Sequence, residues 1–383
     1  MASERKLTVL QILPALNAGG VERGTLEVGK YLVENGHRSL VMSAGGRMVE
    51  QLQREGSEYF DWTIGKKSLW TLRLIWPLRR FLIEQKVDVL HVRSRMPTWV
   101  AYLAWKGMES VTRPKFVTTV HGSYTVNAYS AVMTKGERVI AISEFIRSYI
   151  LQHYKDVNPD NIRLIHRGVD AAQFPYGYQP DATWLSAWHQ QYPQLKDKRV
   201  LTLPARITRW KGQEDFIQLI AKLKQQGLAV HGLMVGEAHP RKQGFLQELK
   251  QLAVMLGVQD YVSFVGHRTD LREIMAVSNI VFSLSNEPEA FGRTTVEALS
   301  LGRLVIGYDH GGVGEQLREI LPQGCVPLGD LAALAALAAH WLEKPLVVPS
   351  PQPFTLQRMT QGTLAVYNEL FIVASSNPIG ASH

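Results

Sequence analysis

The chain has 383 residues, of which 45% are hydrophobic and 20% are charged, so it suits two domains with separate cores and excludes a low-complexity or disordered protein. Its single cysteine, Cys325, excludes an intrachain disulfide. The net charge of +8 comes from the first part of the chain, because residues 1–176 hold 24 Lys and Arg against 16 Asp and Glu. Residues 177–383 hold 18 basic and 18 acidic residues. This asymmetry predicts a polyanionic partner for the first domain, either anionic lipid, a phosphorylated acceptor or nucleic acid.

The N-terminal segment predicts a buried strand over residues 7–13 and a helix over residues 21–34. The apolar run before Pro14 is too short for a secretory signal, and no run of 18 apolar residues follows, so we expect a cytoplasmic protein or one bound to a membrane surface. Gly19 and Gly20 stand where the strand gives way to the helix. They do not form the G-x-G-x-x-G pattern, which argues against a dehydrogenase.

Residues 66–85 combine tryptophans with basic side chains, and the pattern predicts an amphipathic helix that starts near residue 68. Indole rings favour the headgroup region of a membrane, and cations nearby attract anionic lipid. An alternative is a helix that simply covers the first domain. The residues that we expect at an anionic membrane or at the acceptor are Lys66, Lys67, Trp70, Arg73, Trp76, Arg79 and Arg80.

The first part of the chain alternates predicted strands with helices, which is typical of a parallel, doubly wound sheet. The later strands are expected at 39–43, 87–92, 115–120, 138–142 and 162–165. Ligands of such sheets gather beyond the carboxyl ends of the strands. His121 directly follows one of these strands, and Arg93 and Arg95 follow another, so the histidine is a candidate ligand contact and the arginines are candidates for acceptor anions.

Residues 176–198 interrupt the periodic pattern and are expected to connect the domains, and a second strand–helix alternation begins at residue 199. Arg206 and Lys211 lie in the loop after the strand expected at 200–204. Two such cations can converge on a diphosphate without a metal ion. The chain contains no D-x-D pair, so we expect no metal site.

Residues 286–315, NEPEAFGRTTVEALSLGRLVIGYDHGGVGE, contain the strongest candidate site. A helix is expected to begin after Gly292, and the backbone N–H groups of Gly292, Arg293 and Thr294 would form an anion site at its start. Glu289 and Glu297 lie on either side, which suits a ligand with hydroxyls at both ends of its phosphates, as in a nucleotide sugar. A strand at 304–307, a glycine-rich loop at 310–314 and a helix from about residue 315 follow.

The C-terminal part predicts a long helix over residues 331–343, an extended segment with four prolines, and an amphipathic helix over residues 355–371 that returns to the first domain. Residues 374–383 are expected to fray.

The 286–315 motif resembles the signature of family-4 retaining glycosyltransferases of the GT-B fold, and more narrowly of bacterial enzymes that build the lipopolysaccharide core. IHRGVDAAQF, residues 165–174, resembles the family segment that leads out of the first domain. The resemblance implies an α/β GT-B fold in which two Rossmann-like, doubly wound domains face each other across a cleft. An acceptor-binding domain would span residues 1–176, a nucleotide-sugar domain would span residues 177–354, and the helix at 355–373 would pack on the first.

The resemblance also implies roles for the candidate residues. Arg206 and Lys211 would bind the donor pyrophosphate, His121 and Glu289 would contact the transferred sugar, Glu297 would bind the ribose, and Gly19 and Gly20 would border the donor phosphates. We therefore predict His121, Arg206, Lys211 and Glu289 as catalytic residues and the start of the helix at Gly292, Arg293 and Thr294 as part of the nucleotide site. No cofactor is expected beside the donor, for which a UDP-sugar is preferred and GDP-mannose remains open.

The predicted activity is transfer of a hexose, with retention, to a lipid-linked lipopolysaccharide core glycan or a related surface glycan at the inner face of the cytoplasmic membrane. One alternative is a nucleotide-sugar epimerase of similar architecture. Another is a non-catalytic protein that binds membrane or nucleic acid. Nucleic acid is disfavoured because aromatic and basic residues coincide in only one stretch, which is helical and apolar.

Overall fold

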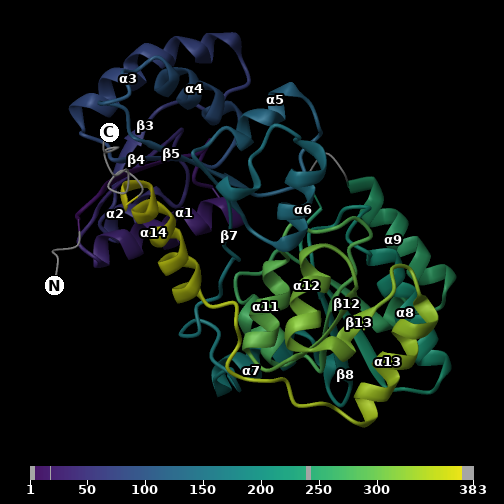
Figure 1. The fold of residues 1–383 in the computed structure, drawn as a ribbon. Coiled ribbons are helices and arrows are strands. Elements are labelled where there is room, and N and C mark those ends of the chain that lie inside the picture. The colour runs from purple at the N-terminus through teal and green to yellow at the C-terminus, as the bar shows by residue number, and fades with distance from the viewer. Residues whose placement is uncertain (1–4, 18, 239–242, 373–383) are drawn as a thin grey trace, which may run out of the picture. The chain divides into compact units, whose positions relative to one another are not determined.

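The computed structural model describes residues 5–17, 19–238 and 243–372, which form two compact α/β units (Figure 1). The N-terminal unit comprises the chain up to Arg167 together with the segment from Leu356, and the C-terminal unit is Gly168–Thr355. We expected the first domain to end at residue 176, whereas the observed division comes earlier, after Arg167. The described part of the chain contains no helix that is both long and apolar enough to cross a bilayer.

The N-terminal unit is built on a seven-stranded sheet in the order β3-β2-β1-β4-β5-β6-β7. All its strand pairs are parallel. The strands are β1 (Thr8–Ile12), β2 (Arg38–Ser43), β3 (Glu58–Asp61), β4 (Val89–Val92), β5 (Lys115–Val120), β6 (Arg138–Ala141) and β7 (Ile162–Leu164). The chain order reverses between β1 and β4, so the loops after these two strands lie at the point where doubly wound sheets bind ligands.

Helices cover both faces of this sheet. The helical segments are α1 (Gly20–Glu34), α2 (Val49–Arg54), η1 (Leu69–Leu74), α3 (Ile75–Glu84), α4 (Arg95–Lys106), α5 (Ala128–Ala131), η2 (Val132–Thr134), α6 (Glu144–His153), η3 (Pro159–Asn161) and α14 (Leu356–Ile372). Alternate residues of β1 point to opposite faces, so Leu10 and Ile12 pack with α3 and α4, whereas Val9 packs with α1 and α14.

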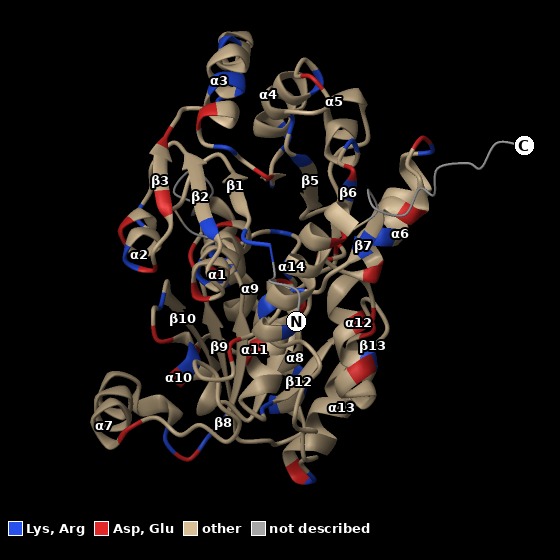
Figure 2. Ribbon diagram, turned by 60° about the vertical axis from the view of Figure 1, so that its left-hand side comes forward, with Lys and Arg blue, Asp and Glu red and all other residues tan. Residues whose placement is uncertain are grey.

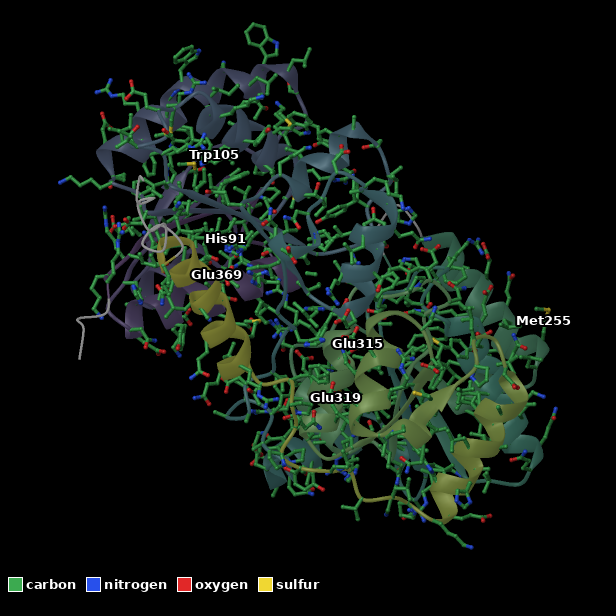
Figure 3. All side chains as sticks on the ribbon, viewed as in Figure 1. His91, Trp105, Met255, Glu315, Glu319 and Glu369 are labelled. Carbon is green, nitrogen blue, oxygen red and sulfur yellow. The ribbon has the colours of Figure 1, made fainter. Side chains whose placement is uncertain are left out.

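Helix α14 joins the N-terminal unit although it ends the described chain. Tyr367 is fully buried, and its hydroxyl lies 2.6 Å from His91 Nδ1 on β4. Glu369 accepts hydrogen bonds from Arg138 and from Arg163, the latter at 3.0 Å (Figure 3). These contacts, together with the apolar cluster beneath α1, fix α14 to the sheet.

The C-terminal unit is a six-stranded sheet in the order β10-β9-β8-β11-β12-β13, again with parallel pairing throughout. Its strands are β8 (Arg199–Pro204), β9 (Val230–Val235), β10 (Val262–Gly266), β11 (Ile280–Ser283), β12 (Leu304–Tyr308) and β13 (Cys325–Val326). Its helical segments are α7 (Ala182–Gln191), η4 (Pro193–Leu195), α8 (Gln213–Gln225), α9 (Gln243–Met255), η6 (Gln259–Tyr261), α10 (Leu271–Ala276), α11 (Arg293–Ser300), α12 (Gly311–Ile320), η7 (Pro322–Gly324) and α13 (Leu331–Glu343). The prediction of two Rossmann-like, doubly wound domains is confirmed.

The expected connection at residues 176–198 is wrong in part, because it contains helix α7, which packs on the C-terminal unit. The Asp181 side chain accepts from Trp184 N and begins the helix. Trp188, one turn after Trp184, is 3% exposed and packs with Leu195 and Leu233. Leu185, Ser186 and Ala187 stand between the tryptophans, so the apolar residues do not recur at helical spacing only, and the sequence pattern showed no clear period.

Two further local predictions differ from the structure. The segment that we expected to be helical from residue 68 begins as the 3₁₀ turn η1 and becomes α-helical only at Ile75. The glycines at 311, 312 and 314 lie inside α12 rather than in a loop before it. The short strands β3 and β13 had no signal in the sequence analysis, and residues 374–383 lie outside the described chain.

Candidate functional site

The candidate site of the C-terminal unit lies where its strand order reverses, between β8 and β11, which pair directly. The loops after these strands, residues 205–212 and 284–292, therefore emerge side by side at the carboxyl edge of the sheet. Asn286 N donates to Trp210 O over 2.9 Å, and Asn286 Nδ2 donates to Arg209 O over 3.2 Å. These bonds join the two predicted donor-binding loops.

Lys211 and Glu289 meet at this junction. Lys211 Nζ lies 2.7 Å from Glu289 Oε1, and the two side chains are 13% and 18% exposed. Ser285 Oγ donates to the same carboxylate oxygen over 2.6 Å, and Lys211 Nζ lies 4.0 Å from the centroid of the Trp210 ring. The cation is therefore held by a carboxylate and an indole face in a partly desolvated position, where its attraction for an anion is less screened than on the open surface.

Gly212 sets the path of the Lys211 loop. Its φ of +72° is left-handed, and a Cβ there would lie 1.9 Å from Leu284 O. Only glycine fits this position, because both the backbone conformation and the contact exclude a side chain.

Arg206 lies on the same loop as Lys211 but is exposed. Its side chain forms no hydrogen bond or ion pair with any residue in the described ranges, and its carbonyl accepts from Gln213 Nε2 over 2.9 Å. The two predicted pyrophosphate ligands thus differ, because Lys211 is held in an ion pair whereas the Arg206 side chain is exposed and makes no such contact. Their shared role remains a prediction.

The helix start at Gly292 has the geometry of an anion site. Gly292 adopts φ +86°, and no side chain caps α11. The first-turn N–H groups of a helix lack intrahelical acceptors and carry partial positive charge, which favours a phosphate. A Cβ at Gly292 would lie 2.6 Å from Val313 Cγ2 of α12, so this close approach also requires glycine.

Glu297, the predicted ribose ligand, is 4% exposed and lies in the second turn of α11. Its Oε1 is 3.5 Å from Arg293 Nε. A ligand hydroxyl that binds Glu297 must therefore approach beside Arg293, a neighbour that the sequence analysis placed at the phosphate. Both roles remain predictions.

The glycines of α12 support the Glu289 segment through the backbone. Gly312 N donates to Glu289 O over 2.8 Å, and a Cβ at Gly311 would lie 2.7 Å from the same oxygen. The side-chain amide of Gln316 donates to Phe291 O, and His310 Nε2 lies 2.6 Å from Ser285 O. The glycine-rich segment is thus explained by a helix that packs directly on the backbone of residues 285–291.

His121, in the N-terminal unit, is held by Arg167. Arg167 Nη2 lies 3.1 Å from His121 Nδ1 and donates to Gly20 O over 3.3 Å. Because a guanidinium can only donate, Nδ1 must accept, and the proton of a neutral ring resides on Nε2. Burial, followed by the charges of Arg167 and Arg93, holds the pKa of His121 well below its usual value. Nε2 is buried without a partner among the described residues, so it is an unused hydrogen-bond donor.

Arg93 does not face an acceptor, contrary to prediction. It is 2% exposed, and its Nε and Nη2 donate to Gln11 Oε1 over 3.0 and 2.6 Å. The position after a strand was read correctly, but the side chain turns back to join β4 to β1 inside the sheet.

The predicted membrane surface is largely exposed, with one exception. Leu69, Trp70 and Trp76 are 84%, 77% and 72% exposed, and the exposed basic residues around them are Lys66, Lys67, Arg73 and Arg80. Figure 2 shows basic positions in blue along α3. Arg79 instead donates to Ala104 O and Leu103 O over 2.9 and 3.1 Å. Arg79 Cζ also lies 4.5 Å from the centroid of the exposed Trp76 ring, so this half-buried side chain links the end of α4 to the predicted surface, and its role there remains a prediction.

Sequence reasoning missed Ser285, Trp210 and Arg167. Ser285 contacts Glu289, and the ring of Trp210 contacts Lys211. These contacts depend on the folded loops, so residue spacing in the sequence does not reveal them. Arg167 stands in the quoted IHRGVD motif and was given no role. Within the described ranges, no three or more His, Cys, Asp or Glu side chains gather to hold a metal ion.

Comparison with known proteins agrees with this architecture. Residues 18–173 match Glycosyltransferase Family 4, and residues 186–355 match Glycosyl transferases group 1. A glycosyltransferase of Rickettsia africae, known from its crystal structure, is 30% identical with a TM-score of 0.83 and with coverage of 96% of this chain and 99% of that one.

Two other relatives are more distant. The N-acetyl-alpha-D-glucosaminyl L-malate synthase of Bacillus anthracis is 26% identical over 346 residues, which are 86% of each chain. An Anabaena protein in complex with UDP and glucose is 21% identical with a TM-score of 0.75, covers 97% of this chain and 100% of its own, and shares the fold. With two matching domains and a relative of 30% identity over nearly the whole length, this chain belongs to the family-4 glycosyltransferases of the GT-B fold.

Proposed function

We propose that this glycosyltransferase moves a hexose from a nucleoside diphosphate sugar to a lipid-linked glycan of the lipopolysaccharide core, or a related surface glycan, at the inner face of the cytoplasmic membrane. It retains the anomeric configuration and uses neither a metal ion nor a cofactor beyond its substrates. The observation that carries the proposal is the ion pair of Lys211, on the loop after β8, with Glu289, on the loop that leads to the uncapped start of α11, over 2.7 Å.

This arrangement suits a diphosphate. Lys211 supplies one fixed cation, Arg206 supplies a second that is free to fold onto a ligand, and the first turn of α11 supplies N–H donors. Positive groups fixed before the reaction stabilise the charge that grows on a departing diphosphate. Bond cleavage at the sugar therefore needs no metal in this proposal.

The chemical step is a single exchange of bonds at the anomeric carbon. The bond from that carbon to the diphosphate oxygen breaks, and a bond to the acceptor hydroxyl oxygen forms on the same face. The acceptor proton passes to an oxygen of the departing diphosphate, so no enzymic base is consumed. Glu289, which accepts from Ser285 and pairs with Lys211, orients the sugar through its hydroxyls and offsets positive charge at the anomeric carbon.

The neutral ring of His121 fits a sugar contact. Its Nε2–H is a donor without a protein partner in the described chain, and Arg167 fixes the ring orientation. A hydroxyl of the transferred sugar satisfies that donor in this proposal. Burial lowers the pKa of His121, which favours the neutral ring, and the contact from the Arg167 guanidinium to Nδ1 requires the same state.

The donor base is proposed as uridine. Support comes from the Anabaena relative, whose structures hold UDP, UDP and glucose, or UDP-glucose. GDP-mannose is the second choice, since a lipopolysaccharide core biosynthesis mannosyltransferase of Rhizobium leguminosarum is 23% identical over 54% of this chain.

The proposed acceptor and location rest on the N-terminal unit. Its excess of basic residues and its exposed tryptophans suit an anionic lipid surface. Distant relatives include the Rhizobium enzyme and a phosphatidyl-myo-inositol mannosyltransferase of Mycobacterium leprae, which is 25% identical over 67% of this chain. Their names describe a lipopolysaccharide or lipid acceptor.

A panel of nucleotide sugars and free nucleoside diphosphates tests the donor assignment through thermal unfolding. A ligand at about 100 times its Kd stabilises the native state by about 2.7 kcal/mol, so the true donor should raise the Tm clearly. Incubation of that donor with and without lipopolysaccharide core acceptors then separates transfer from epimerisation, because an epimerase converts the donor alone. No shift with any nucleotide, or conversion of donor to an epimer without acceptor, would refute the proposal.

A further inference from the structure

Arg95, the first residue of α4 in the N-terminal unit, lies against two aromatic rings. Its Cζ lies 4.9 Å from the Tyr124 ring centroid and 5.5 Å from the Tyr129 ring centroid. The loop that carries both tyrosines follows β5, and Arg95 follows β4, so these residues share the carboxyl edge of the sheet where ligands of this fold gather.

Arg95 is half-buried and has no acidic partner among the described residues. Residues 110–136, which include the tyrosine loop, contain no Asp or Glu. One N–H of the guanidinium donates to Ser130 Oγ over 3.3 Å. A guanidinium has five N–H donors, so most of them are left for a ligand or solvent.

The two aromatic rings give Arg95 what a binding cation needs. They hold the charge through cation–π attraction and restrict the long side chain, which lowers the entropy lost when a ligand binds. The remaining in-plane donors match the paired oxygens of a phosphate or carboxylate. The start of α4 adds partial positive charge of the same sign, because the Ser94 side chain does not cap it.

Tyr129 and Tyr124 extend this cluster in two directions. The Tyr129 hydroxyl is buried without a partner in the described part of the chain, so it is available to an occupant. The Tyr124 hydroxyl accepts from His121 N over 3.3 Å. The cluster therefore adjoins the histidine that we propose for the transferred sugar, at the edge where an acceptor would have to lie.

We infer that Arg95, held between Tyr124 and Tyr129, binds an anionic group of the acceptor, a phosphate monoester or a carboxylate on its glycan. This inference rests on the proposed function, since it names the charge of the acceptor for the same reaction. It makes Arg95 a specificity residue for the acceptor and gives it no part in holding the donor.

The test compares anionic and neutral hexoses in the presence of saturating UDP, which fills the phosphate site of the C-terminal unit. Glucose 6-phosphate, glucuronate and glucose serve as probes, with binding followed by calorimetry or ligand-detected NMR. The wild type should prefer at least one anionic probe over glucose by about tenfold, the factor expected for one charge-assisted contact. The phosphate and carboxylate probes show which of the two groups is preferred.

Arg95→Gln should abolish this preference and leave the affinity for UDP unchanged. Arg113→Gln is the matched control, because Arg113 also stacks on an aromatic ring, with its Cζ 4.1 Å from the Trp105 ring centroid, but precedes β5. If Arg95→Gln fails to fold, Arg95→Lys serves instead. Lysine keeps the positive charge between the rings but lacks the paired N–H donors of the guanidinium, so it should lower the preference for anionic hexoses severalfold.

Three outcomes decide the matter. An anion preference that survives in the folded Arg95 variants, or is absent in a wild type that binds UDP, overturns the inference and leaves the proposed function intact. A preference lost equally in Arg113→Gln also overturns it, because general positive charge would then be its source. An anion preference that depends on Arg95 in a protein that binds no nucleotide supports the anion site and refutes the proposed function.

Discussion

Lys211 Nζ and Glu289 Oε1 lie 2.7 Å apart, which joins the loop after β8 to the loop after β11 in the C-terminal unit. The pair places a cation and an acid at the reversal point of the sheet, just before the start of α11. Substitution of Lys211 leaves the partly buried Glu289 carboxylate without its counterion, and substitution of Glu289 does the same to Lys211, so each change also disturbs the partner residue.

We expect Lys211→Ala to lower kcat/KM by the order of 10²-fold, the usual loss for one oriented group that stabilises charge in the transition state. Lys222→Ala removes an exposed lysine of α8 and should leave the kinetics unchanged. Glu289→Gln combined with Lys211→Ala should cost less than the two single effects together, because the residues act as a pair. Near-normal turnover in Lys211→Ala would remove it from the pyrophosphate site.

Glu297→Gln should weaken the binding of free UDP as well as of the intact donor, since both carry the ribose. Loss of one hydrogen bond to a charged group costs about 1.5–3 kcal/mol, which is roughly 10- to 100-fold in Kd. Glu319→Gln, an exposed position of α12, is the control (Figure 3). Calorimetry with UDP decides the role, because an unchanged Kd for the nucleotide would place the ribose elsewhere.

His121 should make stability depend on pH. Burial and the charges of Arg167 and Arg93 lower its pKa in the folded state, whereas the unfolded chain takes up the proton as the pH falls through about 6.5. The unfolded state then binds more protons, so the free energy of unfolding should decrease below that pH by about 1.4 kcal/mol per pH unit. His91, whose pKa is also well below its usual value because it is buried, acts in the same direction.

Urea unfolding at a series of pH values from 7.5 to 5 measures this slope. His121→Gln should reduce it, and His189→Gln, which alters an exposed histidine of α7, should not. An identical slope in the His121 variant would show that this ring is not kept neutral by folding.

Gly24→Ala should disturb the Arg167–His121 contact. A Cβ at Gly24 would lie 2.1 Å from Arg167 Nη1, so the guanidinium would have to move from Gly20 and His121. Misplacement of about 1 Å can cost about 10²-fold in rate, and we expect turnover to fall toward that limit. Gly244→Ala in α9 meets no atom within 4 Å and should retain full activity. Equal activities of the two alanine variants would dismiss Arg167 as a positioning residue.

Replacement of Trp70 and Trp76 by serine should release the protein from vesicles that contain anionic lipid. Both indoles are exposed, and each nearby Lys or Arg contributes about 1 kcal/mol of attraction to such a surface. Met255→Ser removes a similarly exposed apolar side chain from the C-terminal unit and should leave flotation unchanged (Figure 3). Flotation of the double tryptophan variant with the vesicles, like the wild type, would refute the membrane surface.

The strand–helix alternation and several local sites could be predicted because they depend on residues that are close in sequence. Apolar runs and glycines predicted most strands and the helix that begins after Gly292, and the helix at 331–343 has the predicted bounds. Helix α7 was missed because Leu185 and Ala187, between the two tryptophans, blur the spacing of a single apolar face, and only packing against Leu233 shows which face is buried.

The sequence by itself therefore determined two doubly wound domains and the edge at which their functional loops emerge, because hydrophobic periodicity and the alternation of strands with helices are local patterns. Tertiary structure alone decided that Lys211 pairs with Glu289, that Arg79 binds the end of α4, that Arg93 turns inward, and that Arg95 lies between two tyrosines. The reason is that a charged side chain finds its partner through the folded arrangement of distant loops. Its type and its place after a strand do not specify which atoms it will meet.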